Sequence, residues 1–201
     1  MSGRHRAALK FVPFYAAGAT GKRYCVWMQT PDTLKMQRIS LFSQGTATRS
    51  REGNRTGDIR NPAPGVFVVT FDGAKQEQDW YAIRLDSPVT VNEIRFTQGG
   101  LFHDGGWFDT SDGKPRIQVQ KEPDGPWIDL ATLAEYPSTT AANPGGLREG
   151  EKFHVVFPPV RIYGVRVIGR PACGDNPSQS FSSCEGLEGF YFYGSQGRSS
   201  N

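Results

Sequence analysis

The chain has 201 residues, the size of one domain or of one domain with a short attached segment. Its 24 glycines, 14 prolines and 12% aromatic residues favour many short strands joined by tight turns over a helical bundle. The net charge is only +3, without a concentrated basic face, and no apolar run approaches the about 18 residues of a membrane-spanning helix, so we expect neither nucleic acid nor a membrane as partner.

The N-terminal part is predicted to form a hairpin. Residues 9–16 and 23–28 have the composition of strands, and a Gly-containing turn lies between them. A lone hairpin is marginally stable in water, so residues 1–31 are interpreted as the remnant of a preceding domain or as a partner of the domain that follows. The polar residues 195–201 are predicted to be a disordered tail.

Residues 32–194 are predicted to form one β domain. Apolar and polar residues alternate along short segments, as where Ile117 and Val119 alternate with polar neighbours. A shift of the alternation at residues 92–93 predicts a β-bulge, and two prolines at 158–159 predict the end of a strand. Seven or eight strands with Gly/Pro-rich connections indicate an all-β fold, an antiparallel β-sandwich or jelly roll. The expected strands are residues 81–85, 89–96, 116–120, 127–130, 153–157, 163–167 and 187–193.

Three loops are longer than plain connections require, namely residues 46–65, 97–115 and 169–184. Sandwiches carry function on such end loops. The second loop combines aromatic and acidic residues with five glycines, and this composition suits a sugar: aromatic rings stack on pyranose faces, while carboxylate, amide and guanidinium groups bind hydroxyls. The candidate ligand-binding residues are His103, Asp104, Trp107, Phe108, Asp109 and, from the first loop, Arg55.

The alternative reading of the second loop is structural. Its aromatic residues would fold inward and plug the end of the sandwich, and its aspartates would cap turns. We favour this plug for Trp107 and Phe108, and we weigh the two readings equally for His103 and Asp104.

Catalysis and metal binding have weaker signals. The three histidines do not fall in a recognisable Ser/His/Asp order, and neither a Gly-x-Ser-x-Gly motif nor a His-x-x-x-His zinc pair is present. The aspartates at 104, 109 and 112 are more typical of turns than of a glycosidase pair. Oxygen-rich residues of the first loop, Asn54 and Asp58, are candidate calcium ligands, although an ordinary turn explains them as well.

Cysteine usage leaves two alternatives open. Cys173 and Cys184 bracket the third loop, so they could form a bridge that closes it, with Cys25 unpaired. Two free buried thiols are equally compatible with the sequence.

The segment from Asp79 to Phe96 resembles the core of the factor V/VIII type C family, which is discoidin-like and includes the family 32 carbohydrate-binding modules. Later segments follow that family's order, so the similarity covers about residues 37–194. The resemblance implies a galactose-binding-domain-like jelly roll that is non-catalytic, binds glycans, lipids or proteins through loops at one end, and often holds structural calcium. The family's calcium site uses a glutamate of the closing strand; here Gly186 occupies that position, and Glu185 and Glu188 flank it, of which Glu188 is the candidate ligand.

The hairpin is similar to the closing strands of bacterial β-L-arabinofuranosidase-type glycoside hydrolases, the family once called DUF1680, through Val-Pro-Phe-Tyr-Ala at 12–16 and Val-Trp at 26–27. This resemblance implies that the chain is the C-terminal accessory part of a secreted or periplasmic bacterial enzyme.

The leading hypothesis is a non-catalytic carbohydrate-binding module that recognises a glycan or polysaccharide. The alternative is a discoidin-like module that binds protein or packs against the catalytic domain of its own parent chain. A free-standing hydrolase ranks last.

Overall fold

The computed structural model describes residues 11–17, 23–29 and 39–192. The chain divides into two compact units, residues 1–38 and 39–201. In the first unit, β1 (Phe11–Ala17) and β2 (Arg23–Gln29) pair antiparallel, with Phe11 opposite Gln29 and Ala17 opposite Arg23. The two strands of the expected hairpin therefore pair, whereas its turn at 18–21 and the expected tail at 195–201 lie outside the described residues.

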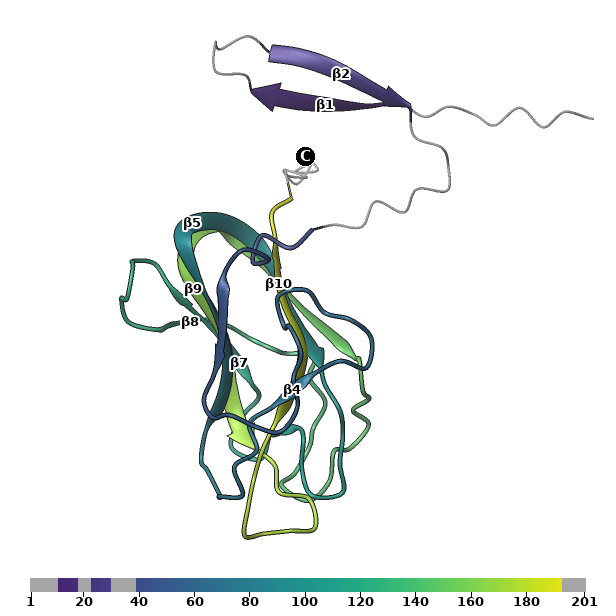
Figure 1. Ribbon diagram of the computed structural model, residues 1–201, viewed down its shortest axis with the longest axis vertical. Helices are drawn as coiled ribbons and strands as arrows, with labels where there is room; N and C mark the ends of the chain where they lie inside the picture. Colours follow the sequence, from purple (N-terminus) through teal and green to yellow (C-terminus); the bar gives the residue numbers. More distant parts are fainter. Residues whose placement is uncertain (1–10, 18–22, 30–38, 193–201) are drawn as a thin grey trace, which may run out of the picture. The chain divides into compact units, whose positions relative to one another are not determined.

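The second unit is an all-β sandwich built from antiparallel strands (Figure 1). The strand order is β4-β10-β5-β9-β7-β8, with β3 paired to β5 and β6 paired to β9. No helix among the described residues could span a membrane. The strands are β3 (Thr46–Arg49), β4 (Val68–Val69), β5 (Asp79–Gln98), β6 (Phe108–Asp109), β7 (Arg116–Gln120), β8 (Ile128–Thr132), β9 (Lys152–Pro171) and β10 (Ser183–Phe190).

The two 20-residue strands β5 and β9 pair with each other along most of their length and belong to both layers of the sandwich. The N-terminal half of β5 also pairs with β3, and its C-terminal half also pairs with β10. The C-terminal half of β9 also pairs with β7. The predicted bulge is confirmed by a register shift between Val91 and Glu93. The predicted strand end at residues 158–159 is wrong, because Val156 and Val160 both pair with β5 while the prolines lie between them, where no ladder hydrogen bond is needed.

The core lies between the two layers. Inward-facing residues alternate along the strands as the sequence predicts, and the side chains of Tyr81, Ile83, Ile117, Val119 and Leu187 are fully buried. Because this alternation places every second side chain in the core, function is left to the outer faces and to the loops.

The three long loops gather at one end of the sandwich. In Figure 1 the blue, teal and yellow-green loops lie at the lower end, away from the bend in β5. Hydrogen bonds between them include Asp175 N–H to the His103 carbonyl (2.9 Å) and Gly106 N–H to the Phe181 carbonyl (3.0 Å). Residues distant in the sequence therefore meet there.

Candidate functional site

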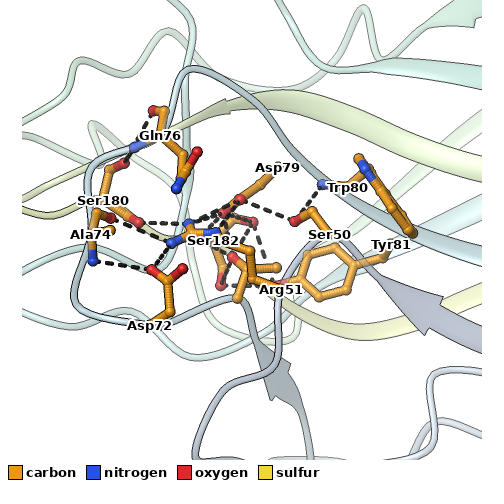
Figure 2. Close-up of polar contacts among 11 residues, drawn as sticks. Ser50, Arg51, Asp72, Ala74, Gln76, Asp79, Trp80, Tyr81, Ser180 and Ser182 are labelled. Carbon is orange, nitrogen blue, oxygen red and sulfur yellow. Dashed lines mark hydrogen bonds and ion pairs between the residues drawn. The ribbon is translucent and has the colours of Figure 1, made fainter.

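A buried carboxylate anchors the loops at this end (Figure 2). Asp79 begins β5 and is fully buried. Its Oδ1 accepts hydrogen bonds from Ser50 Oγ (3.1 Å) and Arg51 Nη2 (2.9 Å), and its Oδ2 accepts from Ser182 N–H (3.1 Å) and from Thr70 Oγ1. These partners come from the first loop, from the chain after β4 and from the third loop, so one side chain fixes all three segments.

Arg51 extends the same cluster towards the surface. Its guanidinium donates to the Ser180 carbonyl (2.8 Å) and forms an ion pair with Asp72, in addition to its bond with Asp79. Only 11% of the Arg51 side chain is exposed. A buried ion pair requires good geometry and saturated hydrogen bonds, and this one has both. The loops are therefore held in a defined arrangement.

A hollow of about 200 Å³ lies between the anchored loops, lined by Asn54, Arg55, Val69, Phe71, Phe102, Asp104 and Phe181. Three of its lining side chains, Phe71, Phe102 and Phe181, are aromatic. Phe181 packs edge-on against Phe71 with ring centroids 5.2 Å apart, and Phe102 lies 5.7 Å from Phe181 at a tilted angle. Phe71 and Phe102 are half-buried, so parts of their rings remain available to a ligand.

Polar groups stand at the rim of this hollow. The Arg55 guanidinium lies 5.9 Å from the centroid of the Phe102 ring. Within the described part of the chain, neither the Arg55 guanidinium nor the Asn54 amide has a hydrogen-bond partner. Asp104 accepts a hydrogen bond from Gln179 Nε2 (2.7 Å), which leaves its other oxygen able to accept from a ligand. The rim thus offers donors and acceptors beside an apolar floor.

His103 lies beside Asp104 but is turned towards the third loop. Its Nδ1 is 3.0 Å from Asp175 Oδ1, and the side chain is 80% exposed. The hydrogen bond and the negative charge of Asp175, with a further contribution from Asp104, raise the pKa of His103 above its usual value. The contact between His103 and Asp175 links the second and third loops.

Two glycines allow these loops to approach closely. Gly174 has φ = 55°, and a Cβ there would overlap the His103 carbonyl oxygen. Gly105 has φ = 141°, and a Cβ would lie 2.8 Å from the Phe181 ring. Both backbone conformations are rarely adopted by other residues, so the composition of the loops determines how the wall of the hollow is built.

Of the six ligand-binding residues predicted from the sequence, the structure brings together only some. Arg55 and Asp104 line the hollow, and His103 adjoins it. The assignment of Trp107 and Phe108 as ligand contacts is wrong, because the two side chains are 1% and 0% exposed; they plug the end of the sandwich, as the alternative reading favours. Trp107 Nε1 donates to the Thr140 carbonyl (2.8 Å).

The prediction that Asp109 contacts a ligand is also wrong. It is 3% exposed and caps a turn, since its Oδ1 accepts from Ser111 N–H (2.9 Å) and Ser111 Oγ (2.7 Å). Its Oδ2 lies 3.9 Å from Arg170 Nε on the outer face of the sheet. The turn-capping role that the sequence offered as the alternative therefore holds for Asp109, which does not line the hollow.

The three calcium candidates lie in separate surroundings. Asn54 lines the hollow, and Glu188 on β10 faces Arg95 at 3.6 Å. Asp58 is occupied by Arg60, whose Nε lies 2.7 Å from Oδ1, and this hydrogen bond is the main cause that lowers the pKa of Asp58 to about 2. No group of three His, Cys, Asp or Glu side chains suited to a metal occurs among the described residues.

Cys173 and Cys184 are both buried and both free. The structure therefore contains two free buried thiols and no disulfide between Cys173 and Cys184. Burial raises the pKa of the Cys184 thiol well above its usual value, so this group is inert as a nucleophile.

Phe71, Phe102 and Phe181 line the hollow but are not among the site residues predicted from the sequence, and Asn54, also in the lining, was predicted as a calcium ligand instead. Phe181 is the only aromatic residue in the third long loop, residues 169–184, and this position could have identified it as a candidate ligand contact. Phe71 follows the short strand β4, and nothing local distinguishes it from a core residue.

Neither a protein-family model nor a curated protein matches this sequence. Solved structures do match. A family 32 carbohydrate-binding module from a family 31 glycoside hydrolase of Clostridium perfringens aligns over 77% of this chain and 96% of its own, with 14% identity and a TM-score of 0.56. The sandwich has the fold of the family 32 carbohydrate-binding modules.

Two further structures support the same fold. A family 32 module from C. perfringens, in complex with GalNAc-β-1,3-galactose, covers 74% of this chain and 96% of its own at 12% identity and a TM-score of 0.51. Chitosan-binding module 1 of a chitosanase/glucanase from Paenibacillus sp. IK-5 covers 76% and 99% at 19% identity, also with a TM-score of 0.51. The expected discoidin-like sandwich is therefore confirmed.

Proposed function

We propose that this chain is a non-catalytic carbohydrate-binding module that holds one sugar residue in the hollow at the loop end. The observation that carries the proposal is the convergence, in one hollow, of a half-buried aromatic ring with a carboxylate and with a guanidinium that has no hydrogen-bond partner among the residues that the structure describes. Phe102 would stack on the ring face, and Arg55 and Asp104 would bind adjacent hydroxyls.

The size of the hollow sets the size of the ligand. Sites for drug-sized ligands enclose about 300–1,000 Å³, whereas this hollow has about 200 Å³. It suits a single ring, such as the terminal residue of a glycan, with the rest of the chain in solvent. The complex of the matched module with a disaccharide supports this choice of ligand class.

A glycan array followed by titration calorimetry on the bound glycan tests the proposal. Arg55→Ala and Asp104→Ala should each weaken binding about tenfold, because each removes a charge-assisted hydrogen bond. The exposed arginine at 161 supplies the control: Arg161→Ala should bind as the wild type does. Equal affinity of all three variants would remove the hollow from the binding site.

The alternative, a discoidin-like module that packs against protein, keeps one supporting observation: Trp107 and Phe108 of the second loop are buried rather than presented. Absence of binding to every glycan, together with association of the chain with a separately produced catalytic domain, would favour it.

Membership in a larger bacterial glycoside hydrolase and a secreted or periplasmic location are part of the proposal. The first draws support from the hairpin resemblance and from a matched module that belongs to a glycoside hydrolase. The reading frame upstream of the first codon tests it directly.

A further inference from the structure

A second and larger depression lies on the outer face of the sheet, away from the hollow. It encloses about 760 Å³. Its floor is formed by Ile168 and Arg170 of β9 with Arg116 of β7, and its walls are residues 76–78 and 112–114. We call it the sheet groove. Its volume is within the range of about 300–1,000 Å³ of ligand sites.

The walls of the sheet groove are fixed by the fold. The main chain of Gln76 is held on both sides by Ser180, which accepts from its N–H (2.8 Å) and donates to its carbonyl (3.1 Å; Figure 2). The opposite wall follows β6, where Asp109 is paired with Arg170. Asp112 of that wall forms an ion pair with the same arginine. The groove is therefore preformed, which lowers the cost of binding.

The polar groups of the groove favour a neutral polyhydroxylic ligand. Its lining carries three cations, Lys114, Arg116 and Arg170, and two carboxylates, Glu77 and Asp112. Asp129 pairs with Arg116, and the buried Asp109 lies behind Arg170, so the three cations are offset by carboxylates and no positive excess remains to attract an acidic ligand. The side-chain amides of Gln76 and Gln78 have no hydrogen-bond partner in the part of the chain that the structure describes.

An aromatic edge continues the groove across the sheet. Trp80 of β5 and Arg116 of β7 are both register partners of Ile168, so the three residues form one row across the outer face. In the neighbouring row, the Arg166 guanidinium lies 5.9 Å from the Trp80 ring centroid and 4.6 Å from that of Trp127. Both indoles are half-buried. Such a surface offers stacking planes beyond the polar groove.

We infer that the sheet groove is a second subsite that binds an internal segment of a neutral polysaccharide, of two or more sugar residues. This inference rests on the proposed function and extends it from a terminal sugar to a chain. Arg170, with Glu77 and Gln78 on the facing wall, would supply the donors and acceptors for successive hydroxyls, and Trp80 would border the segment.

Affinity electrophoresis in gels that contain β-1,4-galactan, xylan, glucomannan or dextran tests the inference, with polygalacturonate as the acidic comparison. The groove variants are Arg170→Ala and the double variant Glu77→Ala/Gln78→Ala. Glu77 and Gln78 are exposed, so their truncation should not impair folding, whereas Arg170 is half-buried and its variant is compared with the wild type for stability as well. Arg161→Ala is the matched control. Circular dichroism of each variant verifies the fold.

At least one neutral polysaccharide should retard the wild type, and both groove variants should bind it about tenfold more weakly. Their affinity for a short glycan in the hollow should be unchanged. Unchanged retention of both groove variants, retention only by polygalacturonate, or no retention by any neutral polymer would overturn the inference. In each of these cases the wild type should still bind short glycans, and Asp104→Ala should still bind them more weakly. Failure of the groove proposal is therefore distinguished from failure of the hollow proposal.

Discussion

The carboxylate of Asp79 and the guanidinium of Arg51 meet at 2.9 Å beneath the loops that carry the candidate site. Arg51 is three residues before Asn54 and four before Arg55, both of which line the hollow. The ion pair therefore positions the polar rim without touching a ligand, and the sugar-binding geometry that we propose depends on a residue at the start of β5.

Asp79→Asn should destabilise the sandwich by about 3 kcal/mol, because it removes the buried charged partner of the nearly buried Arg51 and leaves only the more exposed Asp72 to pair with it. Urea denaturation measures this loss. The control Asp124→Asn removes one partner of an exposed ion pair with Arg84 and should change stability by less than about 0.5 kcal/mol. Equal effects of the two substitutions would show that burial of Asp79 contributes nothing.

Trp107→Ala should cost about 3–5 kcal/mol of unfolding free energy, since it removes a fully buried side chain and leaves a cavity. Trp107→Phe should cost less, and the folded protein should bind glycans with wild-type affinity. Denaturation together with calorimetry separates the two roles. A Trp107→Ala variant of wild-type stability that no longer binds would restore Trp107 as a ligand contact.

His103 should titrate above its unperturbed pKa of 6.5 because Asp175 stabilises the imidazolium. Since the folded-state pKa is the higher one, any stabilisation by the pair is present below pH 6.5 and is lost as the pH rises through the folded-state pKa. An NMR titration of the imidazole protons measures the pKa. Asp175→Asn should lower it towards 6.5, and an unchanged midpoint would contradict the pairing.

Gly174→Ala should destabilise the third loop by about 1–3 kcal/mol and weaken binding in the hollow, because φ = 55° is strained for alanine and its Cβ would meet the His103 carbonyl. The matched control is Gly146→Ala, where nothing lies within 4 Å of the added Cβ. Thermal unfolding and calorimetry of both variants check this. If Gly174→Ala unfolded and bound glycans as the wild type does, the close contact between Gly174 and the His103 carbonyl would be contradicted.

Much of the fold could be predicted from the amino-acid sequence. Alternation along Ile117 and Val119 identified a strand whose apolar side chains face the core, although Gln118 and Gln120 on its other face are buried as well, and the shift at residues 92–93 identified the bulge. The prolines at 158–159 misled the prediction, because a proline ends a strand only where its missing N–H is needed by a neighbour. That condition depends on pairing register, which is not local.

The candidate site, too, could be predicted only in part from the sequence. Residue types in the second loop indicated a sugar, but they could not show that Trp107 is buried while Asp104 lines the same hollow as Arg55 of the first loop. Local periodicity reports only which positions share one face of a strand. Contacts between loops arise from the register of distant strands, from positive φ at Gly174 and from the burial of Asp79, so only the folded chain determined which residues meet.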